Sequence, residues 1–384
     1  MPLSLDGHLF DPFDSYPKTN LPRLRVQVLS KIAFQYYPLE LNPASNPFLA
    51  SWWPLSLHDP LLFHVTLQTA SWDDEMNARR GFPHSELLMK DSVSLLRHRV
   101  QDQSLAFRDA TMNAVITLAA IEGNMGVSKM HIDGVKRMVG VRGGLTEVKK
   151  TSPLTARMVP WVSLLVTCLP QFEAQDDSGA GDGVSTIQEW QLELPLDQDA
   201  SFLDLSGLGI DPVVERTLTR LRCIFGERSS KHPGLMSTTD FHDLTCFILH
   251  RLLNLHPPTS VDPFSANTSE CLRFGITIHM LTAHGPTYYS HANFLRSLLL
   301  QFKHHLEHLD LLDAPDSFML WSFSIAAVAA IGMNELHWFR EQLSALFARL
   351  NLRYWEDFKT HLKKVLWLEA RSEIWFQQLW EEIT

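Results

Sequence analysis

The side chains of this sequence that could contact a nucleic acid or a phosphate gather in HIDGVKRMVGVRGGL, residues 131–145. Cations next to two glycines can reach phosphates, but they can also simply close a helix. No aromatic residues that would stack on bases are interleaved with these cations, so the run is more typical of a solvated helix side than of a DNA-reading surface. Its weak basic face is formed by Lys129, Lys136 and Arg137.

A second pattern with chemical potential is the histidine pair of KHHLEHLD, residues 303–310. His304 and His308 are four residues apart, which places two imidazoles on one helix face where they can chelate a metal. The glutamate arrangement of the zinc-protease HExxH motif is missing, and a catalytic zinc needs three protein ligands. We therefore expect a solvated helix face, no metal site and no cofactor.

Motifs of covalent catalysis and phosphate binding are missing as well. The sequence has no G-x-S-x-G nucleophile elbow and no Walker loop. GAGDG, residues 179–183, lies in an acidic stretch with no strand before it, where phosphate would be repelled. The sequence therefore predicts a protein that is not an enzyme. Because a fold can bring scattered catalytic residues together, a helical biosynthetic-pathway enzyme stays an open alternative, as does a helical scaffold protein.

The composition indicates a globular protein with a large core. Of its 384 residues, 45% are hydrophobic and 20% are charged, which is too apolar for global disorder. The formal net charge of −10 opposes the binding of polyanions by overall attraction. Any nucleic-acid site must therefore be local.

Three further features indicate a protein that stays inside the cell and out of the membrane. The four cysteines have neither a metal-binding nor a disulfide spacing, so we expect reduced thiols. The opening residues, MPLSLDGHLFDPFDSYPKTN, carry three aspartates and no apolar stretch, unlike a secretory signal. The longest apolar run, residues 317–332, is shorter than the roughly 20 residues that span a bilayer, and it predicts a buried central helix.

The hydrophobic periodicity predicts an all-α fold. We expect a large helical domain of roughly 12–15 helices with an acidic irregular segment in the middle. No segment alternates enough to demand a sheet. The predicted parts are an N-terminal extension at 1–20, an N-terminal helical half at 21–170, an acidic linker at 171–212 and a C-terminal helical half of the same domain at 213–384.

Individual helices follow from the same periodicity. One is expected over about 21–36, and helices fill most of 60–142, whereas five prolines keep residues 38–60 out of regular structure. Within that passage Phe48, Trp52 and Trp53 must be buried against something. After residue 213, helices are expected at about 213–227, 238–253, 268–284, 290–307, 315–332, 335–350, 355–368 and 371–382.

The helix that contains the basic face has recognisable ends. Ser128 is the predicted N-cap, and the apolar side chains of Ile132, Val135 and Val139 are expected to face the core. The pair Gly143-Gly144 supplies the left-handed residue that closes many helices. Arg142 would favourably meet the negative end of the helix dipole.

The segment 158–215 contains no Lys, Arg or His. Its centre, QDDSGAGDGVST, has the composition of a flexible linker. The acids that follow alternate with Trp and Leu, a compositional hint of a transcriptional activation segment. A long surface loop between two helical halves is the favoured interpretation, because structureless segments of this length are otherwise uncommon.

The stretch MHIDGVKRMVGVRGGL resembles the H-L-x-G-L-x-x-M-I-x-x-R-G-G-L signature of the fungal-specific transcription factor domain. This domain is the helical middle region of fungal binuclear zinc cluster regulators. Residues 11–17, 46–71 and 109–126 also resemble the family's proline-rich entry, its D-P-x-L-F-H helix and its L-A-x-x-E helix, in the expected order. The resemblance covers about residues 8–170. The residues that match the signature are His131, Gly134, Met138, Arg142, Gly143, Gly144 and Leu145.

The resemblance implies a non-enzymatic transcriptional regulator or co-regulator of a filamentous fungus, located in the nucleus and controlling a metabolic or secondary-metabolite gene cluster. Its expected partners are other transcription factors or coactivators, with a small-molecule effector and a second copy of the chain as further candidates. The family reads DNA through a six-cysteine zinc cluster, whereas the first cysteine here is Cys168. We therefore do not expect direct DNA binding by these residues. Either the chain acts through partners, or a zinc cluster is encoded upstream of it.

Overall fold

The computed structural model describes residues 28–37, 39–79, 81–122, 124–193, 201–226, 236–256, 262–287, 291–309 and 314–384. These described residues form 18 α-helices and no strand, apart from an isolated bridge between Ala174 and Val184, so the all-α prediction is confirmed. Thirteen of the helices have eleven or more residues, within the predicted range of roughly 12–15. The other five have four to seven residues. Two of them, Ala33–Tyr36 and Gln103–Ala106, lie within predicted helical ranges, whereas Trp53–Leu57, Leu145–Thr151 and Gln188–Gln191 were not predicted, because one or two turns leave little periodic pattern.

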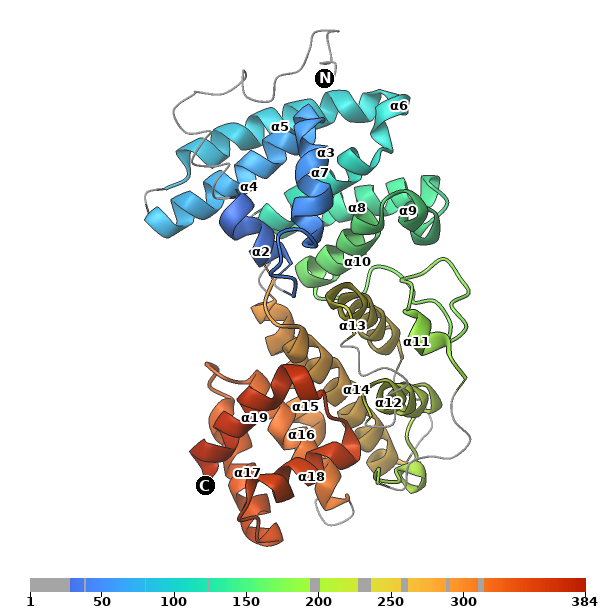
Figure 1. Cartoon of the computed structure of the whole chain (residues 1–384), viewed down its shortest axis with the longest axis vertical. Helices are drawn as coiled ribbons and strands as arrows, with labels where there is room; N and C mark the ends of the chain where they lie inside the picture. Colours follow the sequence, from blue (N-terminus) through green and yellow to red (C-terminus); the bar gives the residue numbers. More distant parts are fainter. Residues whose placement is uncertain are drawn as a thin grey trace. The chain divides into compact units, whose positions relative to one another are not determined.

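The described residues divide into two compact units. The first comprises the chain up to Ala174, together with Gly181–Ser185 and residues 286–287. In this unit α7 packs against α4, α8 and α10 (Figure 1). Ten of its residues from Ala110 to Ala119 are buried, so α7 is a central element of the unit's core. The elements are η1 (Val28–Ile32), α2 (Ala33–Tyr36), η2 (Phe48–Trp52), α3 (Trp53–Leu57), α4 (Pro60–Ala78), α5 (Pro83–Gln101), α6 (Gln103–Ala106), α7 (Asp109–Ile121), α8 (Met125–Val141), α9 (Leu145–Thr151) and α10 (Pro153–Thr167).

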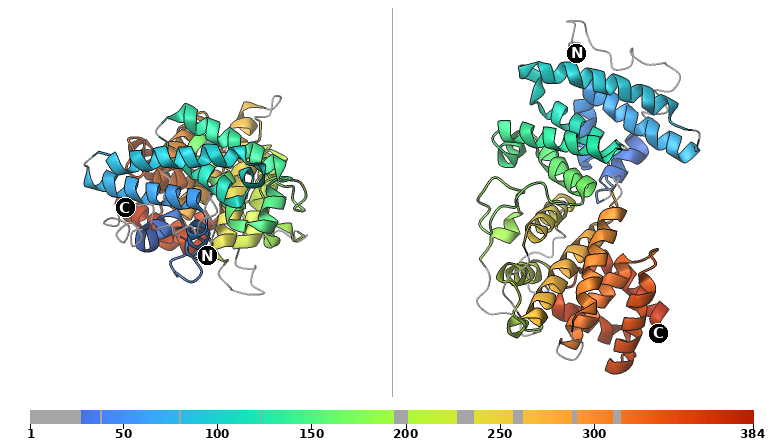
Figure 2. Two further views of the ribbon diagram at one scale, coloured as in Figure 1. Left: turned by 90° about the horizontal axis from the view of Figure 1, so that it is seen from above. Right: turned by 180° about the vertical axis from the view of Figure 1, so that it is seen from behind.

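The second unit is built around α14, a helix of 22 residues. This helix packs against α12, α13, α15, α16 and α19, and both views in Figure 2 show the unit from further sides. Almost every residue of α16 is buried, which confirms the predicted central helix. The eight helices predicted after residue 213 are all present. The elements are α11 (Gln188–Gln191), η3 (Ser206–Leu208), α12 (Pro212–Phe225), α13 (Thr238–Leu253), α14 (Pro263–His284), α15 (Ala292–Glu307), α16 (Asp316–Ala329), α17 (Leu336–Leu350), α18 (Trp355–Val365) and α19 (Glu369–Ile383).

The prediction that prolines keep 38–60 out of regular structure is wrong for residues 48–57. The helical turns η2 and α3 occupy them, with Pro47 at the N-cap of η2 and Pro54 in the first turn of α3. Proline is tolerated at these positions because the first N–H groups of a helix have no intrahelical partner. Phe48 and Trp52 are buried as expected, whereas Trp53 is only half-buried; Trp52 Nε1 donates to Thr66 Oγ1 at 3.0 Å.

The predicted cap at Ser128 is also wrong. Helix α8 begins one turn earlier, and its N-cap is Asn124, whose side chain accepts from the amides of Gly126 at 2.9 Å and Val127 at 3.2 Å. Asparagine caps helices as well as serine does, so the choice between two good caps depends on packing. Ser128 instead lies inside the helix, buried, and its hydroxyl donates to the carbonyl of Glu122.

Some predictions fall outside this description or stay untested. The predicted extension 1–20 and residues 21–27 of the first predicted helix lie outside the described residues, whereas 28–36 are helical. The union of both helical halves in one domain stays a prediction. Across the part of the chain that the structure describes, no helix is both long and apolar enough to cross a bilayer.

Candidate functional site: an acidic strap over an arginine cluster

A cluster of charged side chains in the second unit lies where the acidic segment crosses α12 and α13. Two pieces of the segment belong to this unit, Gln175–Ala180 and residues 186–191, and together we name them the strap. A tight turn shapes the first piece. Asp176 Oδ1 accepts from the hydroxyl of Ser178 at 2.7 Å and from the amides of Ser178 at 2.9 Å and Ala180 at 2.8 Å. These hydrogen bonds, led by that from the Ser178 hydroxyl, lower the pKa of Asp176.

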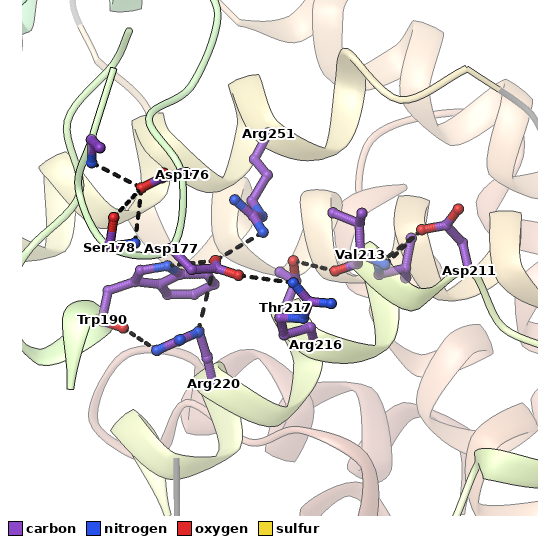
Figure 3. Close-up of polar contacts among 12 residues, drawn as sticks. Asp176, Asp177, Ser178, Trp190, Asp211, Val213, Arg216, Thr217, Arg220 and Arg251 are labelled. Atoms are coloured by element: carbon purple, nitrogen blue, oxygen red, sulfur yellow. Dashed lines mark hydrogen bonds and ion pairs between the residues drawn. The ribbon is translucent and has the colours of Figure 1, made fainter. Parts of the chain in front are cut away.

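Asp177, the next residue, lies between three arginine side chains (Figure 3). Its carboxylate is 3.3 Å from Arg216 Nη1, 3.8 Å from Arg220 Nε and 2.8 Å from Arg251 Nη2. Arg216 and Arg220 stand four residues apart on α12, which places them on one face of the helix, and Arg251 comes from the end of α13. The side chains of Arg220 and Arg251 are 13% and 12% exposed, whereas that of Arg216 is 51% exposed. We name these three residues the arginine cluster.

Trp190 fixes the second piece of the strap to the same cluster. Its side chain is fully buried, and its Nε1 donates to Asp177 Oδ1 at 3.2 Å. The guanidinium carbons of Arg220 and Arg251 lie 5.5 and 5.8 Å from its ring centroid, within the range of cation–π attraction. Arg220 also donates to the backbone carbonyl of Trp190. The strap is therefore held by a buried aromatic ring as well as by charge.

The buried arginines are in a costly environment for a cation. Burial lowers the pKa of Arg251, the charge of Asp177 opposes this effect, and Arg216 and Arg220 add to it. The Nε atoms of Arg220 and Arg251 are buried and have no hydrogen-bond partner among the described residues. Planar guanidinium groups bind carboxylate and phosphate oxygens with paired N–H donors. The arrangement can therefore hold an oxyanion, and Asp177 is the one that the structure shows there.

A second anchor lies beyond residue 200. Arg222 of α12 donates to the carbonyls of Val365 at 2.8 Å and of Leu203 and Lys364 at 3.1 Å. Its guanidinium also lies 4.9 Å from the ring centroid of Phe202. Burial lowers the pKa of Arg222 to about 10. Helix α12 thus binds the acidic segment on both sides of residues 194–200, which lie outside the described residues, through Arg216 and Arg220 on one side of the helix and Arg222 on another.

The predicted signature residues take up different positions along α8. Met138 is buried, and His131 is half-buried, so that burial lowers the pKa of its imidazole. Gly134 has no atom within 4 Å of where a Cβ would stand, so packing within the described chain does not require a glycine there. These three residues do not converge with the others on one site. Of the weak basic face, Lys129 and Arg137 are exposed, and Lys136 donates to Gln171 Oε1 at 3.3 Å.

The remaining signature residues meet at the end of α8. Gly143 and Gly144 have φ angles of +88° and +97°, and the amide of Gly144 donates to the carbonyl of Val139 at 2.9 Å. This hydrogen bond, with that from Gly143 to Gly140, makes a Schellman motif, so the predicted helix closure is confirmed. Arg142 ties this end to α7, donating to the carbonyl of Phe107 at 2.9 Å and to Asp109 Oδ1 at 3.0 Å.

The histidine pair and the cysteines do not belong to a metal-binding group in the part of the chain that the structure describes. The rings of His304 and His308 are 4.4 Å apart, but His308 Nδ1 is occupied by the carbonyl of His304 at 2.7 Å. Among the described residues, no three His, Cys, Asp or Glu side chains are grouped to hold a metal. All four cysteines are free thiols. Asp182 of GAGDG lies beside the start of α9, with Oδ1 3.4 Å from the amide of Thr146.

Comparison of the chain with family models, curated proteins and solved structures gave no match. The site therefore rests on its own geometry. The sequence analysis did not predict the arginine cluster, although Arg216 and Arg220 directly follow the segment 158–215, which contains no cations. Their four-residue spacing beside a segment without cations was the available signal.

Proposed function

We propose that this protein is a non-enzymatic transcriptional regulator or co-regulator of a filamentous fungus that acts through contacts of its helical units. The observation that carries the proposal is that three segments resembling the fungal-specific transcription factor domain pack together. They contribute α4, α7 and α8, and α7 contacts both of the others. This packing is what a single helical domain that contains the three segments requires.

Individual residues of these segments perform tasks that support the resemblance. Asp59, in the D-P-x-L-F-H part, caps α4 through the amide of Leu62 at 3.0 Å. The same carboxylate binds Arg99 of α5 with both oxygens, at 2.7 and 3.1 Å, and the side chain of Arg99 is buried. Paired hydrogen bonds of this kind are among the strongest polar contacts in proteins. Arg142 of the signature joins α8 to α7 through a single hydrogen bond, from Nη1 to Asp109 Oδ1 at 3.0 Å.

The regulator would work in the nucleus on a metabolic or secondary-metabolite gene cluster, with other transcription factors or coactivators as partners. Direct reading of DNA is not part of the proposal, because the exposed cations of α8 are few and the chain carries a net charge of −10. The acidic segment, about residues 173–205, is the candidate activation surface. In the described structure its Asp177 and Trp190 are engaged by the arginine cluster, so activation through these residues requires the strap to detach.

A tethered reporter tests the proposal. The whole chain is fused to a foreign DNA-binding module in a fungal host, and reporter output is expected to rise or fall severalfold relative to the module alone. A second fusion carries residues 173–205 alone, and we expect it to activate. If the whole chain changes reporter output but the fusion of residues 173–205 does not, the segment is not an activation surface. If neither fusion changes reporter output, the proposal of a transcriptional regulator is rejected.

A further inference from the structure

The arginine cluster holds more positive charge than its acidic partner neutralises. Three guanidinium groups lie within 4 Å of one carboxylate, that of Asp177, so two positive charges remain in excess. Arg220 and Arg251 are largely buried and flank the Trp190 ring. Buried cations without full compensation are costly, which makes the cluster a local attractor for anions on a chain that is acidic overall.

The cluster also has hydrogen-bond donors to spare. A guanidinium has five N–H donors, and Arg216 uses one of them on Asp177 at 3.3 Å. Its side chain is half exposed, so a ligand can approach it from solvent. Arg220 and Arg251 each keep a buried Nε without a hydrogen-bond partner among the described residues. The Asp177 carboxylate oxygen lies 3.8 Å from Arg220 Nε, too far for a hydrogen bond.

We propose that the arginine cluster binds the phosphate group of a small anionic ligand, with Arg216 as the donor at the surface and with Arg220 and Arg251 supplying charge from the interior. A phosphate monoester at neutral pH carries close to two negative charges, which matches the excess of two positive charges. A monocarboxylate would neutralise only half of that excess.

The proposed ligand has a structural consequence for the strap. Phosphate and the Asp177 carboxylate compete for the same guanidinium groups, so by linkage an anion that binds the cluster weakens the docking of Asp177. The binding itself stands apart from any role in transcription. Only the idea that the ligand acts as an effector rests on the proposed function, and the reporter output tests that role separately.

The test uses the purified whole chain and inorganic phosphate as the probe. Thermal unfolding and titration calorimetry are followed at pH 7.5 with increasing phosphate, against sodium chloride at matched ionic strength. We expect a saturable stabilisation by phosphate beyond that by chloride. Malonate, a dicarboxylate, is expected to bind more weakly. Equal effects of phosphate and chloride, or tighter binding of malonate, would overturn the proposal.

Three variants test whether phosphate binds at the arginine cluster. Arg216→Gln removes a half-exposed donor and is expected to weaken phosphate binding at least tenfold, since hydrogen bonds between charged groups are strong. Arg349→Gln is the matched control, because Arg349 is similarly exposed and pairs with a single carboxylate, that of Asp316. It should bind phosphate like the unaltered chain. Asp177→Asn raises the excess charge to three and should tighten binding severalfold. Unchanged binding by Arg216→Gln, or weaker binding by Asp177→Asn, contradicts the site.

Discussion

Gly144 holds a backbone conformation that only glycine adopts readily, with φ +97° and ψ 179°. A Cβ at this position would also stand 1.8 Å from the carboxylate oxygens of Asp182. That carboxylate can rotate away, whereas the backbone strain remains. Gly144→Ala is therefore expected to lower the free energy of unfolding by about 1–3 kcal/mol, measured by urea denaturation.

Gly140 provides the matched control for this prediction. It lies within α8, and no atom is found within 4 Å of the point where an added Cβ would stand. Gly140→Ala is expected to stabilise the chain by about 0.5–1 kcal/mol, because alanine loses less conformational entropy in a helix. If Gly144→Ala and Gly140→Ala changed the free energy of unfolding equally, this would contradict the positive-φ conformation of Gly144 at the end of α8.

Buried histidines make stability depend on pH. Burial lowers the pKa of His250 to about 4 and that of His279 to about 3, from an ordinary value of 6.5. Neither ring nitrogen of His279 has a hydrogen-bond partner among the described residues. Above pH 6.5 both rings are neutral in the folded and unfolded chain. Below it the unfolded chain takes up protons that the folded chain refuses, so each histidine lowers the free energy of unfolding by about 1.4 kcal/mol per pH unit.

Replacing one histidine isolates this effect. His279 lies between Trp321 and Phe376, so phenylalanine can fill a similar space there. Between pH 7 and pH 5, His279→Phe is expected to lose about 2 kcal/mol less stability than the unaltered chain, measured by urea unfolding at both pH values. If His279→Phe and the unaltered chain lost the same free energy of unfolding between pH 7 and pH 5, this would contradict a neutral, buried His279 ring in the folded chain.

At the scale of elements, the strap depends on Trp190. Its ring is fully buried against Phe247, with the centroids 5.1 Å apart. Trp190→Ala removes the apolar anchor of the strap and leaves a cavity. It is therefore expected to lower the free energy of unfolding by about 3–5 kcal/mol and to expose residues 175–191 to protease cleavage. Trp375→Ala, at a ring that is 46% exposed, is the control and should leave that cleavage unchanged. A strap that resists protease equally in both variants would mean that charge alone holds it.

The long helices were accessible from sequence because their apolar stripes repeat over three or more turns. The helix predicted at 238–253 has the bounds of α13, and that at 335–350 differs from α17 by one residue. Short turns were not accessible in this way. Residues 48–57 were predicted to be irregular because of the five prolines in 38–60, and a single helical turn has no periodic pattern that would indicate otherwise. A proline in the first turn does not break a helix, however.

Only part of the candidate site could be predicted from the sequence. The spacing of Arg216 and Arg220 can be read from the sequence, and so can the absence of cations in residues 158–215. The pairing with Asp177 spans 39 residues to Arg216 and depends on how the strap crosses α12 and α13. Periodicity describes one helix at a time and carries no information on such long-range contacts. The burial of Trp190 belongs to the same class of tertiary facts.

The two units of the molecule have different proposed roles. The first unit contains the segments that resemble the transcription factor domain, closed at α8 by Gly143 and Gly144. The second contains the strap and the arginine cluster. The proposed regulator therefore combines a helical framework with an acidic segment whose docking depends on buried arginines.

The most direct test of the proposed transcriptional role is the reporter output of the whole chain tethered to a foreign DNA-binding module. We predict a severalfold change in either direction for the unaltered chain and for Gly140→Ala. A loss of that change in Trp190→Ala would assign it to the second unit. Output from the unaltered chain equal to that of the module alone, with the fusion present in nuclei at the same level, would contradict the transcriptional role.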